Sequence, residues 1–132
     1  MAGSAMTFTY DVTGPIKVIT ADWTSDDTTG AVSGTTKKVS GYIVAAVTDP
    51  GATAPTANYD IVLNDSEGAD IVGNCDTTLA NRHTSTTERV DFVVSTAAGA
   101  RPATSDEITI AITAAGNSKL GQILIYVDGE IG

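Results

Sequence analysis

The chain has 132 residues, 42% of them hydrophobic, and 16 acidic against 7 basic residues give a formal net charge of −9 at pH 7. A length of roughly 100–200 residues is typical of one domain, and a chain of this size can bury one hydrophobic core. The acidity predicts repulsion from nucleic-acid phosphates and from anionic membranes. We therefore expect no direct contact with nucleic acid and no membrane association.

The N-terminal residues Met1 to Met6 lack the basic start and the apolar stretch of a secretory signal peptide. We expect residues 1–9 to form a flexible arm, because chain termini are often ordered only where something holds them. Such an arm can reach a neighbouring subunit. The remainder shows no linker and no internal repeat, so we predict a single domain over residues 10–132.

Apolar and polar side chains alternate with a period of two in several short segments, which is typical of half-buried β-strands. The alternation is clearest where Ile108, Ile110 and Ile112 share one face. Turn signals separate the segments; Pro50, for example, cannot continue a ladder, and Gly51 permits a turn. The predicted strands cover residues 7–12, 15–23, 37–48, 58–64, 69–72, 89–95, 107–113 and 121–128.

About eight strands at this spacing, with no segment of helical periodicity between them, predict an all-β fold. We expect a single antiparallel β-sandwich that is jelly-roll-like, with little or no helix. Residues 73–87 and 97–105 lack the alternation and are predicted loops, the first with a single helical turn as the alternative. The longest apolar runs are far shorter than the ~20 residues that span a bilayer.

The candidates for chemistry begin with the single cysteine, Cys75, and the single histidine, His83. One cysteine allows no intramolecular disulfide and no thiolate zinc site, so we interpret Cys75 as a small apolar side chain in or near the core. A catalytic triad holds its histidine between a nucleophile and a carboxylate. His83 lies in a polar segment without a nucleophile-elbow pattern, which favours a surface or interface residue.

Carboxylates gather in the middle of the chain, and paired carboxylates perform acid–base chemistry only at defined separations. Asp65 and Glu67 flank a predicted hairpin turn, where acidic residues are common. Calcium is an alternative, because residues 65–70 and 22–27 each offer several oxygens. Neither segment matches the EF-hand loop, and no glycine-rich phosphate-binding motif occurs. We therefore assign no catalytic, cofactor-binding or metal site, predict no cofactor, and expect that the protein is not an enzyme.

Two aromatic residues have more than one interpretation. Tryptophan is enriched in interface hot spots, so Trp23 beside Asp22 could anchor a partner; we favour a core tryptophan at one end of the sandwich. For Asn58, Tyr59 and Asp60 we favour a strand start, with Tyr59 inward and Asp60 outward, over a contact site.

Three groups of short strings occur in a recognisable order. They are DWTSD at 22–26 with SGTT at 33–36 and GYIV at 41–44; DPG at 49–51 with APT at 54–56, NYDIVLND at 58–65 and GADI at 68–71; and AAGNSK at 114–119 with Gly121 and ILIY at 123–126. Together, over residues 16–126, they resemble a group of small structural proteins of tailed bacteriophages, the capsid decoration (cement) proteins.

The resemblance implies a non-enzymatic virion protein on the outer surface of the phage head, made in the cytoplasm of the host bacterium. It implies the major capsid protein of the same phage as the partner, and a homo-oligomer, either a dimer or a trimer. A protein that binds only the assembled head stabilises the assembled state. The family provides no catalytic residue to transfer to this chain.

Two alternatives remain open at this point. The first is a structural component of the head–tail junction or of a tail or fibre base, which copy number per virion would distinguish from decoration. The second is a module that binds a glycan or protein on the host surface, because sandwiches and jelly rolls often have lectin sites. Aromatic residues, which sugar platforms use, make up only 5% of the chain.

Overall fold

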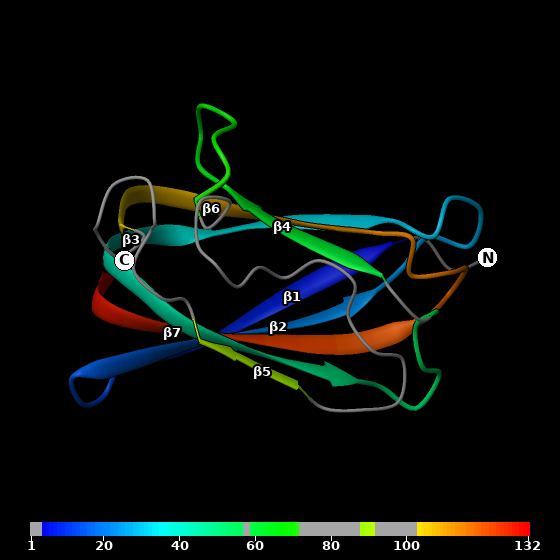
Figure 1. Ribbon diagram of the computed structural model, residues 1–132, viewed down its shortest axis with the longest axis horizontal. Helices are drawn as coiled ribbons and strands as arrows, with labels where there is room; N and C mark the ends of the chain where they lie inside the picture. The colour runs from blue at the N-terminus through cyan, green and yellow to red at the C-terminus, as the bar shows by residue number, and fades with distance from the viewer. Residues whose placement is uncertain (1–3, 57–58, 72–87, 92–102) are drawn as a thin grey trace.

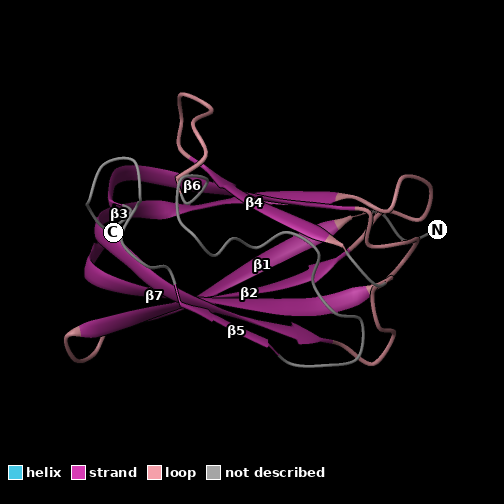
Figure 2. Ribbon diagram, viewed as in Figure 1, coloured by secondary structure: helices cyan, strands magenta, loops and turns pink. Residues whose placement is uncertain are grey.

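The computed structural model describes residues 4–56, 59–71, 88–91 and 103–132. In these residues there are strands and no helix, and hence no helix that could cross a membrane (Figure 2). The prediction of an all-β fold is therefore confirmed. The strands are β1 (Ala5–Asp11), β2 (Ile16–Thr24), β3 (Val32–Pro50), β4 (Asp60–Asn64), β5 (Glu88–Asp91), β6 (Ala103–Thr113) and β7 (Leu120–Ile131).

The strands form one antiparallel sheet in the order β1-β2-β7-β3-β6-β4, with β5 also paired to β3. The 19-residue β3 belongs to both halves of this sheet, because residues 32–42 pair with β6 and residues 39–50 pair with β7. The sheet folds over along β3, so that β6 and β4 lie above β1, β2, β7 and β5 (Figure 1). This folded-over sheet is compatible with the predicted sandwich.

The fold in the sheet depends on two glycines that face each other, Gly41 in β3 and Gly129 in β7. A Cβ atom on Gly41 would lie 2.3 Å from the carbonyl oxygen of Asp128, and one on Gly129 would lie 2.2 Å from that of Ser40. Side chains are therefore excluded at this crossing. Two β-bulges in β3, at residues 35–38 and 43–45, add to the bend, since an extra residue increases local twist.

The core lies between the two halves of the sheet and consists of alternate residues from each strand. The prediction that Ile108, Ile110 and Ile112 share a buried face is confirmed, since all three are fully buried. Burying a side chain of this size contributes roughly 1.5–3 kcal/mol to folding. Among the described residues, the other fully buried large side chains are Ile19, Val39, Ile43, Tyr59, Leu63, Ile123, Ile125 and Val127.

The sheet begins at Ala5, so residues 5–9, which we expected in a flexible arm, form most of β1 instead. The reason is the alternation of Met6, Phe8 and Tyr10, which pack against the core as half-buried side chains. The Tyr10 hydroxyl also accepts a hydrogen bond of 3.0 Å from the backbone amide of Lys37, whose ammonium group lies 4.8 Å from the tyrosine ring centroid.

Three strands extend three or more residues beyond the predicted bounds. β3 begins at Val32 and β6 at Ala103, where we expected residues 37 and 107, and β7 ends at Ile131, where we expected residue 128. After β4, the predicted hairpin is reduced to a tight turn and an isolated bridge between Asn64 and Asp70. The remainder of the predicted loops at 73–87 and 97–105 lies outside the described residues, together with Cys75 and His83.

Candidate interaction surface

The two aromatic candidates are core residues, as we favoured from the sequence. Trp23 is 2% exposed and Tyr59 is fully buried, and their ring centroids are 5.8 Å apart. The indole lies over Gly121, where an added Cβ atom would come within 2.5 Å of the ring. Asp60 is half-buried, and Asn58 lies outside the described residues.

The two acidic segments that could have offered calcium ligands use their carboxylates to form turns. Asp26 accepts hydrogen bonds from the amides of Thr29 and Thr28 (2.9 and 2.8 Å), which hold the pKa of Asp26 below its usual value. Asp65 likewise accepts the amides of Glu67 and Ala69. In the part of the chain that the structure describes, no three acidic, histidine or cysteine side chains come close enough to hold a metal ion.

The outer side of β2, β7 and the second part of β3 carries a set of apolar side chains, which we call the apolar face. Residues paired across an antiparallel sheet share a side, so the outward Leu124 of β7 lies beside Val47, and Tyr126 lies beside Val18. These four side chains are half-buried. They lie on the outer side of the sheet, where the alternation of an antiparallel sheet normally places polar residues. The apolar face consists of Ile16, Val18, Tyr42, Val47, Leu124 and Tyr126.

The most exposed part of the apolar face lies next to the β1–β2 hairpin. Ile16 and Tyr42 both pair with Asp128 of β7, so they flank it in one row, with 44% and 45% of their surfaces exposed. Val12, in the hairpin turn that projects from the end of the sheet, is 53% exposed (Figure 1). These three are the exposed large apolar side chains of the described residues. The β1–β2 hairpin and the strand pairing at Asp128 place all three at the same end of the sheet.

Carboxylates border the apolar face at both ends. Asp128 lies in the row of Ile16 and Tyr42, and Asp11 of β1 pairs with Val18. At the opposite end Asp22 and Asp49 lie on either side of Gln122, whose amide donates a 2.6 Å hydrogen bond to Asp22.

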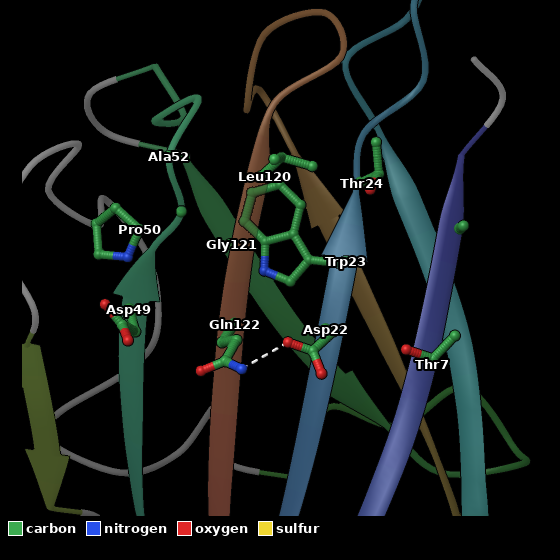
Figure 3. A pocket seen from close by; sticks show the side chains of 12 residues that line it. Thr7, Asp22, Trp23, Thr24, Asp49, Pro50, Ala52, Leu120, Gly121 and Gln122 are labelled. Atoms are coloured by element: carbon green, nitrogen blue, oxygen red, sulfur yellow. Dashed lines mark hydrogen bonds between the residues drawn. The ribbon is translucent and has the colours of Figure 1, made fainter.

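Figure 3 shows Asp49, Gln122, Asp22 and Thr7 side by side on four neighbouring strands, where they line a pocket of about 390 Å³. Among the described residues on this side of the sheet, Arg89 is the cation, and its guanidinium lies 5.2 Å from the ring centroid of Tyr126. The border of the apolar face is therefore mainly acidic.

The outer side of the other half of the sheet, which we call the polar face, has a different composition. Thr35 and Thr109 pair there and their hydroxyl oxygens are 3.1 Å apart, while Lys38 pairs with Glu107. Val62 is the large apolar side chain among the outward residues of β4. The polar face consists of Ser33, Thr35, Lys38, Ser40, Val62, Asn64, Ser105, Glu107, Thr109 and Ala111.

Comparison with known proteins found no family model that matches the chain and no curated protein that is similar to it. The apolar face is only partly visible in the sequence pattern. A signal for part of it was present in β7, where residues 123–127 contain no polar side chain except the tyrosine hydroxyl, so both sides of the strand are apolar. The contribution of Ile16 and Tyr42 depends on strand pairing.

Proposed function

We propose that the chain is a non-enzymatic structural protein of a bacteriophage virion, and specifically a capsid decoration (cement) protein. It binds the major capsid protein on the outer surface of the head and stabilises the assembled shell. The observation that carries the proposal is the apolar face, since a soluble sheet that leaves Ile16 and Tyr42 exposed beside half-buried apolar neighbours is suited to pack against another protein. The resemblance of residues 16–126 to decoration proteins supplies the virion as the setting.

The acidic border of the apolar face indicates the chemistry of the surface it meets. Charged groups around an interface increase the association rate when the two potentials are complementary. Because Asp22, Asp49 and Asp128 border the apolar face, the expected contact on the capsid has an apolar centre and basic side chains around it. The same charges oppose contact with the phosphates of the packaged genome.

The stabilising effect follows from binding to one state only. A ligand that binds the assembled shell and not the separated subunits stabilises the shell by about 2.7 kcal/mol per site when its free concentration is 100 times Kd. With many sites over a head, small contributions per copy add together. The structure needs no catalytic group for this role.

The test compares phage heads that lack this protein with heads to which purified protein has been added. Variants Ile16→Ser and Tyr42→Ser, on the apolar face, are expected to bind heads at least tenfold more weakly. Val62→Ser, which removes an apolar side chain from the polar face, is the matched control and should bind like the natural protein. The measurements are the copies bound per head and the temperature at which the heads release DNA.

Two results would contradict the proposal. If heads without the protein resist heat and low ionic strength as well as complete heads do, the protein does not stabilise the shell. If antibody labelling of virions marks one vertex or the tail, and not the whole head surface, the decoration hypothesis is wrong and the junction or tail alternative is favoured.

A further inference from the structure

The folded sheet has three strands at its edges, and two of them are protected. The edge of β4 is partly covered by the chain itself, because the amide of Ile71 donates a 2.8 Å hydrogen bond to the carbonyl oxygen of Leu63, and Asn64 bridges to Asp70. The edge strand β5 has only four described residues, three of them charged. Charged side chains are one way in which natural sheets prevent edge-to-edge pairing.

The third edge strand, β1, has none of these protections. It has seven residues, of which the six from Ala5 to Tyr10 are uncharged, and it contains no proline. Its register with β2 runs from Ala5 to Asp11 without a bulge. On its other side the described residues provide no strand, so a row of backbone donors and acceptors remains available for pairing.

The side chains of β1 hold this edge in a strand conformation. Met6 and Phe8 pack over Gly34 of β3, where an added Cβ atom would come within 2.9 Å of each side chain. Tyr10 stacks on Phe8, with ring centroids 6.4 Å apart, and accepts the hydrogen bond from Lys37. A strand that is already ordered loses little conformational entropy when a second strand pairs with it.

We propose that β1 pairs antiparallel with β1 of a second copy of this chain, about a two-fold axis near Phe8. We infer a second β1 as the partner strand because the edge is self-complementary: an antiparallel pair related by a two-fold axis needs only one kind of strand. In this register Thr7 lies opposite Thr9 of the second copy, and directly opposed threonines favour pairing. No charged residue of β1 faces a like charge, since Asp11 lies opposite Ala5.

The pairing has a consequence for the arrangement of the apolar faces. A two-fold axis perpendicular to the sheet keeps the outer sides of both copies on the same side, so the joined sheet carries two apolar faces in one direction. Two weak contacts on one particle bind more tightly than either alone, because the second contact forms at high effective concentration. The inference itself does not depend on the proposed function, since it concerns the isolated protein.

The test measures the mass of the purified full-length chain by light scattering and sedimentation over concentrations up to about 1 mM, because a small interface gives weak association. The mass of the natural chain is expected to rise from 13.4 kDa towards twice that value. The double variant Thr7→Lys, Thr9→Lys places like charges opposite each other on the edge and should stay monomeric. The double variant Ala103→Lys, Ser105→Lys changes the net charge equally, at exposed residues of β6, which does not pair with β1, and should still dimerise.

A second measurement does not depend on variants. Hydrogen exchange of the natural chain should show amides in β1 that become slower, by at least fivefold, as the concentration is raised, while those of β6 do not change. A chain that is monomeric throughout the concentration range overturns the proposal, as does a β1 whose exchange is independent of concentration.

The apolar face offers the competing way for two copies to meet, and it is tested in the same experiment. Ile16→Ser and Tyr42→Ser should dimerise like the natural chain. If they abolish the dimer while Thr7→Lys, Thr9→Lys leaves it intact, the copies meet through their apolar faces and the edge proposal is wrong. Because no capsid is present in these measurements, failure of capsid binding leaves this result unaffected.

Discussion

The apolar face and the polar face are the outer sides of the same folded sheet and share one core, yet they differ in what they present to solvent. On the polar face, threonine and serine hydroxyls pair across strands, and Lys38 pairs with Glu107. On the apolar face, Leu124 and Tyr126 occupy the outward positions of β7. An antiparallel sheet with one solvated side needs polar residues there. This departure from the usual pattern is the observation on which the proposed contact with another protein rests.

The largest expected effect is a loss of folding stability, and it should differ between two neighbouring residues of β7 whose side chains point to opposite sides of the sheet. Ile125 is fully buried in the core, so Ile125→Ala should lower the free energy of unfolding by about 2–5 kcal/mol. Leu124→Ala, on the apolar face, should lower it by about 1 kcal/mol but weaken head binding. Urea denaturation and a head-binding assay separate the two. Equal losses of stability would mean that Leu124 belongs to the core.

The next prediction concerns the bend that separates the two faces. Gly41→Ala would push a methyl group against the carbonyl oxygen of Asp128, and overpacking of this kind costs about 1–3 kcal/mol. Gly68→Ala is the control, because that glycine also has a positive φ (+85°) but has open space around it. Thermal unfolding should show the larger decrease in Tm for Gly41→Ala. A larger decrease in Tm for Gly68→Ala than for Gly41→Ala would mean that the close crossing of β3 and β7 does not cause the bend.

A smaller effect is expected from the acidic border of the apolar face. Asp22→Asn with Asp49→Asn should lower the rate of association with heads by about tenfold at low salt, and much less at ~1 M salt, where the Debye length is ~3 Å. The control with the same charge change is Glu67→Gln with Glu107→Gln, at exposed residues outside the apolar face. Surface plasmon resonance at two salt concentrations measures both. A salt-independent rate would mean that these carboxylates do not guide binding.

The smallest effect concerns Asp106, which joins the turn after β4 to β6. Hydrogen bonds from the hydroxyl and amide of Ser66, and from the amide of Glu107, hold the pKa of Asp106 below its usual value. A lowered pKa in the folded state contributes stability that is present above the unfolded value and is lost as pH falls through the folded value.

Asp106→Asn should therefore lower stability slightly at pH 7 and much less near pH 2, as measured by urea denaturation at both pH values. The head-binding of Asp106→Asn should be unchanged, because the residue lies away from the apolar face. A stability difference that is the same at both pH values would show that the carboxylate charge has no part in this contact.

Particular elements show how far sequence patterns predict this fold. The isoleucines of β6 and β7 alternate without interruption, so both strands and their buried sides could be predicted. The start of β3 could not, because Ser33, Gly34 and Thr35 have no apolar alternation and become a strand through pairing with β6. In β1, Met6 and Phe8 did alternate, but a position near the terminus made an arm the expectation.

The apolar face was only partly predictable for the same reason. Leu124 and Tyr126 could be identified as outward apolar residues from β7 alone. Ile16 and Tyr42 are 26 positions apart in the sequence, and each is an ordinary strand residue in its own segment. They flank Asp128 only because β2 and β3 pair with opposite edges of β7.

Composition and periodicity were enough to predict an acidic all-β chain with isoleucine-rich strands, and to predict which side of most strands is buried. These properties depend on composition and on alternation with a period of two, which are local. The strand order, the fold along β3, the convergence of Val12, Ile16 and Tyr42, and the position of β1 at an edge of the sheet could be known only from the three-dimensional structure. Those features arise from contacts between residues distant in sequence, and local periodicity does not predict which strands will pair.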